Sequence, residues 1–243
     1  MLDLAQGPFL VAVADGPQTL ARAAELEVAQ RSFDLVEARL DLYPNQSVDG
    51  CEAACHRLEA SGTPVLITLR TAAQGGRWTG ADAERLPKFR AALAVASWAD
   101  VEDDAPIVEA VAGLLRARAG GQLVVSHHDF SRTPAPGELL ALVDACHRAA
   151  PGALAKLATT IVHDGDRRAL HDLIAKRPER TAVIGMGVAD EGLRVALAAA
   201  GSLLAYGYLG TSTAPGQLSV AALHTRLLGA SPRYAARRGA RLT

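Results

Sequence analysis

The chain has few cysteines and few aromatic residues, and its charge is nearly balanced. Its 243 residues include 3 cysteines, aromatic residues make up 4%, and the formal net charge is −1, from 25 Lys and Arg against 26 Asp and Glu. A small and odd number of cysteines excludes a disulfide framework and indicates a reducing compartment. The balanced charge argues against a protein that binds nucleic acid or a membrane through its overall charge. We therefore expect a local site to choose any partner.

The sequence also lacks the patterns of a signal peptide, a membrane span and a zinc site. Residues 1–15 contain no basic segment ahead of an apolar one. The longest uncharged stretch, 195–223, is interrupted by Gly201 and by the polar run 211–217. Cys51, Cys55 and His56 could share a helical turn, but a zinc site needs more ligands, and buried helical cysteines are the favoured alternative. We expect a soluble cytoplasmic protein without a metal.

Short apolar segments alternate with longer segments of helical composition along the whole chain. Strands are predicted over residues 9–14, 33–40, 65–70, 98–102, 123–126, 154–158, 182–185 and 202–206. Helices are predicted over residues 18–31, 46–60, 81–96, 105–119, 136–149, 165–176, 191–200 and 218–228. Eight such units predict a single (β/α)8 barrel, the TIM barrel, over residues 1–230. The arginine-rich segment 231–243 is interpreted as a flexible, solvated tail rather than a nucleic-acid-binding arm.

In such a barrel the reacting groups lie at the carboxyl ends of the strands. Lys156 is one of only three lysines, and it shares a strand face with Leu154 and Ala158, which predicts that it points into the barrel. Burial would favour the neutral amine that a Schiff base requires; the alternative is an amine that extends from the strand end into solvent. In the preceding strand the alternation directs His128 inward and His127 outward. His128 is therefore a candidate general acid and base, with a structural histidine as the alternative.

Charged residues also occupy two earlier strands. Glu37, Arg39 and Asp41 alternate on one face of the second strand. On an exposed sheet that face would simply be solvated, whereas inside a barrel the three charges need each other or a polar ligand. Arg70 ends the third strand, just before the segment 74–76, and is a further candidate ligand for an anion or a hydroxyl group.

Near the C-terminus, Gly185-Met186-Gly187 precedes a helix that contains Arg194. Asp190 stands where a dinucleotide fingerprint has its third glycine, so that motif is weak. Arg194 and the turn 214–217 suit a substrate carboxylate better, because guanidinium binds carboxylate in a planar fork. The alternative is a surface arginine beside a tight Pro-Gly turn.

Together these motifs resemble those of the type I 3-dehydroquinate dehydratases over nearly the whole chain. The matching segments are Glu37-Ala38-Arg39-Leu40-Asp41, Thr68-Leu69-Arg70 with Gly75-Gly76, Ser126-His127-His128-Asp129-Phe130 with Thr133-Pro134, Lys156-Leu157-Ala158, Met186-Gly187, Arg194, Gly201-Ser202 and Ala214-Pro215-Gly216-Gln217. The resemblance implies a (β/α)8 lyase that converts 3-dehydroquinate to 3-dehydroshikimate in the shikimate pathway of aromatic amino acid biosynthesis. It also implies a cytoplasmic homodimer that needs no metal or organic cofactor.

The same resemblance implies the roles of individual residues. Lys156 forms an imine with the C3 ketone of the substrate, and His128 moves a proton from C2 to the departing C1 hydroxyl. The protonated imine is the electron sink that makes the C2 proton acidic. The implied substrate-binding residues are Glu37, Arg39, Arg70, Arg194, Thr213 and Gln217, with Arg194 and Gln217 at the carboxylate.

Two positions depart from the family pattern. The family usually has Glu where Gln74 stands, and there it orients the catalytic histidine. An amide can orient the ring but cannot stabilise imidazolium by charge, so we expect a lower pKa for His128. Thr213 stands where the family often has Ser, and residues 1–8 are short for the hairpin that caps the barrel floor in many members.

Two other functions remain as alternatives to the dehydratase. One is another Schiff-base lyase or aldolase on the same barrel, and the other is a catalytically silent barrel.

Overall fold

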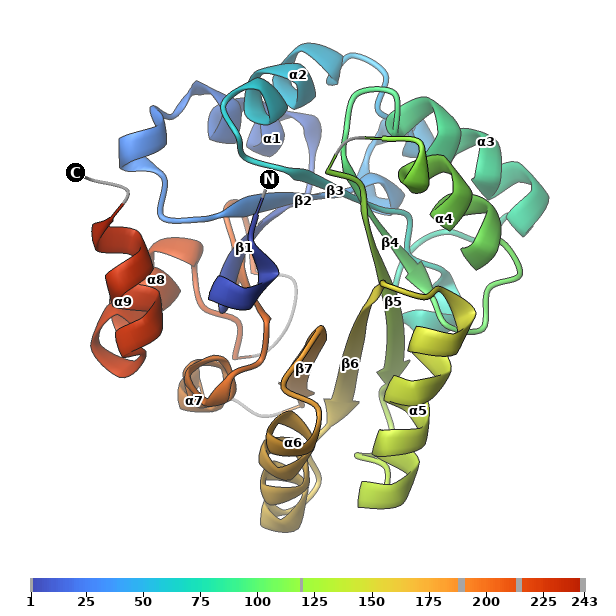
Figure 1. The fold of residues 1–243 in the computed structure, drawn as a ribbon. Helices are drawn as coiled ribbons and strands as arrows, with labels where there is room; N and C mark the ends of the chain where they lie inside the picture. The colour runs from blue at the N-terminus through green and yellow to red at the C-terminus, as the bar shows by residue number, and fades with distance from the viewer. Residues whose placement is uncertain (1, 119, 188–190, 213–215, 241–243) are drawn as a thin grey trace.

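The strands form the inner wall of a barrel and the helices surround them (Figure 1). The computed structural model describes residues 2–118, 120–187, 191–212 and 216–240. Within these ranges the strands are β1 (Phe9–Ala14), β2 (Leu35–Arg39), β3 (Val65–Thr68), β4 (Trp98–Glu102), β5 (Gln122–Asp129), β6 (Leu154–Thr160), β7 (Thr181–Met186) and β8 (Leu204–Tyr208). The helices are α1 (Pro17–Glu25), α2 (Glu52–Ala60), α3 (Asp82–Ala92), α4 (Val108–Arg116), α5 (Pro136–Ala149), α6 (Asp164–Lys176), α7 (Glu191–Ala200), α8 (Val220–Ala230) and α9 (Pro232–Gly239).

The strand order is β7-β6-β5-β4-β3-β2-β1-β8, and neighbouring strands are parallel. The predicted (β/α)8 barrel is therefore confirmed. β5 continues three residues beyond its predicted end at Ser126, because both histidines that follow belong to the strand.

The barrel closes between β7 and β8 without a ladder of paired strand residues in the described chain. The Leu203 amide donates to the Thr181 carbonyl at 2.9 Å. The Ser202 hydroxyl accepts a hydrogen bond from the Val183 amide at 2.8 Å. β8 begins two residues later than predicted, since Ser202 and Leu203 make this seam instead.

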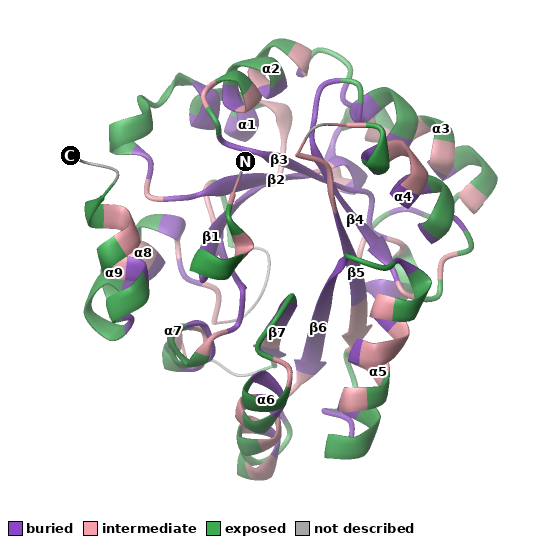
Figure 2. Ribbon diagram, in the orientation of Figure 1, coloured by how far each residue is buried: buried purple, intermediate pink, exposed green. Residues whose placement is uncertain are grey.

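The inner face of the wall changes from apolar to polar along each of five neighbouring strands. The apolar residues form the floor of the barrel and are buried: Leu35, Leu66, Trp98, Val124 and Leu154. The residues two positions later on the same strands are also buried, but they are polar: Glu37, Thr68, Asp100, Ser126 and Lys156. Figure 2 shows that the strands are mostly buried, in contrast to the mixed surfaces of the helices. Polar groups are thus gathered toward the carboxyl ends of the strands, above an apolar plug.

The prediction of a flexible tail from residue 231 is wrong for the described part of that segment. Residues 232–239 form α9, which the hydroxyl of Ser231 caps by accepting a hydrogen bond from the Tyr234 amide. Tyr234 is fully buried, and Arg237 forms a two-pronged ion pair with Asp34 at 2.6 and 2.8 Å. The sequence contained both signals for this helix, a serine cap and a proline at the first helical position. α9 therefore belongs to the barrel domain.

The three cysteines are free and buried, as the favoured alternative predicts, although Cys51 precedes α2 rather than lying inside it. Burial raises the pKa of both Cys55 and Cys146 to about 12. Within the described ranges there is no group of three or more His, Cys, Asp or Glu side chains that could hold a metal ion. No helix in those ranges has both the length and the apolar character needed to cross a membrane.

Candidate active site

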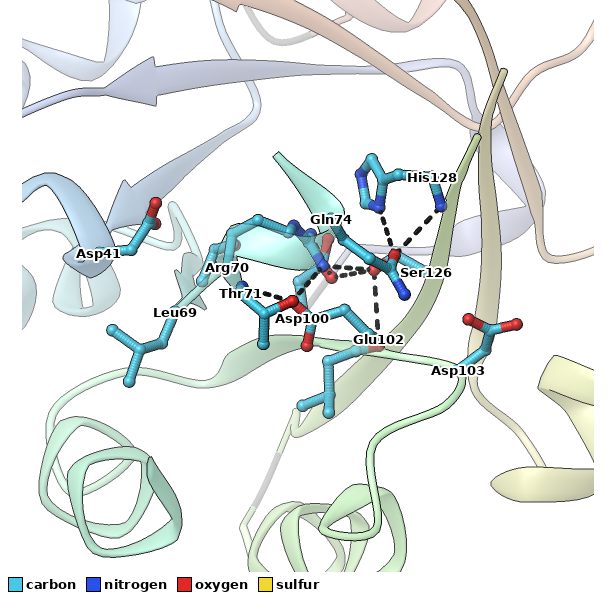
Figure 3. Close-up of polar contacts among 12 residues, drawn as sticks. Asp41, Leu69, Arg70, Thr71, Gln74, Asp100, Glu102, Asp103, Ser126 and His128 are labelled. Carbon is cyan, nitrogen blue, oxygen red and sulfur yellow. Dashed lines mark hydrogen bonds and ion pairs between the residues drawn. The ribbon is translucent and has the colours of Figure 1, made fainter. Parts of the chain in front are cut away.

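A buried network of charged side chains centres on Asp100 of β4 (Figure 3). One carboxylate oxygen of Asp100 accepts hydrogen bonds from Arg70 at 2.7 Å and from the Ser126 hydroxyl at 2.6 Å. The other oxygen lies 2.8 Å from the Nζ of Lys156. Burial alone would raise the pKa of Asp100, but the positive charges of Arg70 and Lys156 hold it well below its usual range. Asp100 is therefore an ionised carboxylate between two cations.

Lys156 points into the barrel from β6, which confirms the alternation argument. The residue is 4% exposed, and its Nζ lies 4.5 Å from the centre of the Tyr206 ring. The Asp100 carboxylate contacts this amine directly at 2.8 Å, a partner that burial alone did not predict. The Tyr206 hydroxyl is buried and has no hydrogen-bond partner among the described residues, so it remains available to a ligand.

The two adjacent histidines of β5 have different partners, as their opposite directions predict. The Nδ1 of His127 lies 3.0 Å from a carboxylate oxygen of Asp103, and the hydrogen bond to Asp103 raises the pKa of His127. The Nδ1 of His128 lies 3.0 Å from the amide oxygen of Gln74. Burial, followed by the charges of Arg70 and Lys156, holds the pKa of His128 well below its usual value. His128 is therefore neutral at neutral pH and can accept a proton.

Two glycines allow Gln74 to reach His128. Gln74 ends a short 3₁₀ helix, residues 72–74, that follows β3. Gly75 has a φ of 80°, a left-handed conformation that favours glycine. A Cβ atom at Gly76 would lie 2.1 Å from the carbonyl oxygen of Arg70. The chain can therefore fold back over the end of β3 only with small residues here, and this turn brings the Gln74 amide against His128 (Figure 3).

Several predicted substrate-binding residues have protein partners. Besides its contacts with Asp100 and Ser126, Arg70 forms an ion pair with Glu102 at 3.1 Å. Glu37 is only 3% exposed and accepts a hydrogen bond from Thr68 at 2.8 Å. The alternative interpretation, that Glu37 lies on a solvated face of the sheet, is therefore wrong.

Arg39 and Asp41 form a two-pronged ion pair with both contacts at 2.8 Å. Asp41 lies beyond the end of β2, in a 3₁₀ helix over residues 40–42, so its predicted place on the strand is wrong. The expectation that these charges need each other is nevertheless confirmed for this pair.

Arg194 lies on α7 beside the segment that holds Gln217. Its Nε donates to the carbonyl oxygen of Gly216 at 3.0 Å. Burial lowers the pKa of Arg194. The structure thus brings Arg194 close to the chain at Gln217, as a shared anion site requires. Thr213, the third residue predicted there, lies outside the described residues.

Three residues of this network were not predicted from the sequence: Asp100, Glu102 and Tyr206. Asp100 and Glu102 share the inner face of β4 with Trp98, so the same alternation that identified Lys156 could have found them. Tyr206 shares the inner wall through β8. Their proximity to Lys156 depends on the register between strands, which alternation within one strand does not give.

The chain is similar to one group of known proteins in both sequence and structure. Residues 11–229 match the family model described as type I 3-dehydroquinase. The 3-dehydroquinate dehydratase of Methanocella arvoryzae is 33% identical over 210 residues, covering 84% of this chain and 92% of that protein. The crystal structure of 3-dehydroquinate dehydratase from Geobacillus kaustophilus is 25% identical with a TM-score of 0.76, covering 91% of this chain and 90% of that one. The corresponding structure from Aquifex aeolicus has the same TM-score at 20% identity, covering 91% and 98%.

Proposed function

Because the chain belongs to the type I 3-dehydroquinase family, we propose that it dehydrates 3-dehydroquinate to 3-dehydroshikimate through an imine on Lys156. One observation carries the proposal. Lys156 and His128 lie on the inner faces of neighbouring strands, where Ser126 pairs in register with Lys156, and both interact electrostatically with Asp100. A lysine nucleophile, a neutral base and a buried carboxylate are the groups that this elimination needs.

The reaction begins when the neutral amine of Lys156 adds to the C3 ketone. The carbinolamine that forms takes up one proton from solvent and loses its hydroxyl as water, which gives a protonated imine with its positive charge at the Lys156 nitrogen. Asp100 is placed to stabilise that charge, because its carboxylate contacts the Nζ at 2.8 Å.

His128 then removes a proton from C2, and the electron pair of that C–H bond moves into the imine to give an enamine. The return of those electrons expels the C1 hydroxyl, which takes the proton from His128 and leaves as water. Hydrolysis of the remaining imine releases the product and restores Lys156. The low pKa of His128 keeps the ring neutral before the step, so that it can act as the base.

The substrate carboxylate is assigned to Arg194 and Gln217, with Thr213 added by the family resemblance. Glu37 and Arg39, at the end of β2, are assigned to the ring hydroxyls. Arg70 supplies positive charge to the same region through its ion pairs with Asp100 and Glu102.

The family assignment also leads us to propose a role in the shikimate pathway, a cytoplasmic location and a homodimer. The metal-free mechanism fits this proposal, since the protonated imine serves as the electron sink.

The test is the ultraviolet absorbance of the conjugated enone after mixing chelator-treated protein with 3-dehydroquinate. We expect absorbance to rise, and we expect borohydride to trap the substrate on Lys156. Lys156→Ala should abolish both signals, whereas Lys176→Ala, at the exposed end of α6, is the matched control. Near-normal turnover by Lys156→Ala would exclude the imine mechanism.

His128→Ala separates imine formation from elimination. This variant should still form a trappable imine, while turnover falls at least about 100-fold because the base is lost. An unchanged rate would assign the base to another residue. No absorbance change with the folded wild-type protein would favour a silent barrel or another ketone substrate.

A further inference from the structure

The amide of Gln74 connects His128 to a second side chain, Asp104, in the loop between β4 and α4. The Nε2 of Gln74 donates to a carboxylate oxygen of Asp104 at 3.0 Å. The Oε1 of Gln74 accepts a hydrogen bond from the backbone amide of His128 at 3.1 Å and lies 3.0 Å from Nδ1 of the ring (Figure 3). Both ends of one buried amide are therefore engaged.

The chemistry of these partners permits only one orientation of the amide. The backbone N–H of His128 can only donate, so the oxygen of Gln74 must face it. The carboxylate of Asp104 can only accept, so the NH₂ group must face that side. With the amide held this way, the ring Nδ1 of His128 must carry its hydrogen toward Oε1. The lone pair then resides on Nε2, the nitrogen left for proton transfer.

We propose that Asp104 is a positioning residue, which fixes the Gln74 amide and thereby the tautomer of His128. This inference rests on the proposed function, because the tautomer matters only if His128 is the base. Asp104 acts through Gln74 and does not contact the ring directly. Its neighbour Asp103 contacts His127 instead.

Without the Asp104 acceptor, only the hydrogen bond from the His128 backbone amide still holds the oxygen of Gln74 in place, and the NH₂ group can turn toward the ring at the cost of that one bond. The NH₂ group donates, so it would favour a lone pair on Nδ1 of His128 and a hydrogen on Nε2. That tautomer would block the proposed reaction, because Nε2 is the nitrogen that must accept the proton. Asn at position 104 keeps an acceptor for Gln74 and should preserve the orientation. Asp104 is exposed, so its replacement should leave the folding of the barrel intact.

The experiment compares Asp104→Leu, Asp104→Asn and the control Asp103→Leu, which removes the neighbouring carboxylate. Asp104→Leu should lower kcat about 10- to 100-fold with KM within about twofold, while borohydride trapping on Lys156 persists. Asp104→Asn should retain kcat within about threefold of the wild type, and Asp103→Leu should match the wild type. Equal kcat for Asp104→Leu and wild type, or equal losses in Asp104→Leu and Asp104→Asn, would overturn the proposal.

A second readout is independent of turnover. The ¹⁵N signals of the His128 ring in the free protein should show a lone pair on Nε2 in the wild type and a shift toward the other tautomer in Asp104→Leu. Identical signals would overturn the positioning role even if the protein dehydrates 3-dehydroquinate. A wild-type protein inactive on that substrate would instead refute the proposed function, while the signals still decide the tautomer.

The same geometry predicts how a carboxylate would behave at position 74. In Gln74→Glu the new carboxylate would face Asp104 where the amide now lies at 3.0 Å, and like charges would oppose each other. In Gln74→Glu with Asp104→Asn the repulsion is removed. In Gln74→Glu alone the two facing carboxylates share a proton, so the new group carries only part of its charge beside His128, whereas in the double variant it is fully charged. The acidic limb of kcat/KM should therefore lie at higher pH in the double variant than in Gln74→Glu alone, and coincident limbs would contradict the inference. The other charges that act on His128 stay the same in both variants: Arg39, Arg70, Asp100 and Lys156.

Discussion

Replacing Arg237 with Met should destabilise the barrel although Arg237 lies only six residues before Thr243. Its guanidinium donates to both carboxylate oxygens of Asp34, at 2.6 and 2.8 Å, and to the Pro8 carbonyl at 2.7 Å. The two side chains are 7% and 0% exposed. Met fills much of the same volume without the charge, so the substitution leaves the Asp34 carboxylate buried.

The expected loss of stability depends on the interactions that Asp34 retains in the Arg237→Met variant. Removal of one partner from a buried ion pair costs about 3–5 kcal/mol. Asp34 retains a hydrogen bond from the Leu10 amide at 2.8 Å and a weaker contact with Arg238 at 3.3 Å. We therefore expect the lower end, about 3 kcal/mol. For a chain of this size that loss lowers Tm by about 6–12 °C.

Thermal unfolding by circular dichroism and urea titration measure the change, with Arg233→Met as the control. Arg233 lies on the same helix and is exposed, so its replacement should change stability by less than about 0.5 kcal/mol. Asp34→Asn combined with Arg237→Met should recover part of the loss, because the buried carboxylate that loses the Arg237 charge is then neutral. A loss in Arg237→Met no larger than in the control would refute the buried ion pair as a source of stability.

Two further predictions concern the reaction. Only neutral His128 accepts a proton, and the pKa of His128 is lowered. We therefore expect kcat/KM to be constant near neutral pH and to fall only well below the ordinary histidine pKa of 6.5. An acidic limb of the kcat/KM profile at or above pH 6.5 would contradict this expectation. Asp100→Asn removes the charge that faces Lys156 and its imine, and kcat/KM should drop at least about 100-fold in the enone assay, while activity equal to that of Asp103→Asn would disprove the role of Asp100.

Alternation within a strand predicted the inward faces of Lys156 and His128, because a period of two depends only on local backbone geometry. The same rule applied to β4 would have predicted that Asp100 faces inward with Trp98. That Asp100 lies between Arg70 and Lys156 could not be predicted this way. It depends on the stagger of β3, β4, β5 and β6, which arises when the barrel closes.

Loop contacts were the other part that the sequence did not reveal. Asp104 and Gln74 are thirty residues apart, and their hydrogen bond depends on where two βα loops meet above the wall. The arginines of α9 were interpreted as solvated because their partner, Asp34, lies about two hundred positions earlier in the chain. Local patterns thus predicted elements and facing directions, whereas pairings across the fold required the structure.

The seam between β7 and β8 is the one junction of neighbouring strands in the described wall that has no ladder of paired residues, so the wall resembles a ring with one weakly bonded joint. Hydrogen-bonded ladders join the other neighbouring strands, whereas a serine hydroxyl and a backbone contact close this joint. Bending of such a ring concentrates where the fewest bonds resist it. Arg194 follows β7 and Tyr206 belongs to β8, so a small change in the width of the joint alters the span between the groups assigned to the substrate carboxylate and those around Lys156. The joint with the fewest hydrogen bonds thus lies between the group assigned to the substrate carboxylate and one of the side chains around Lys156.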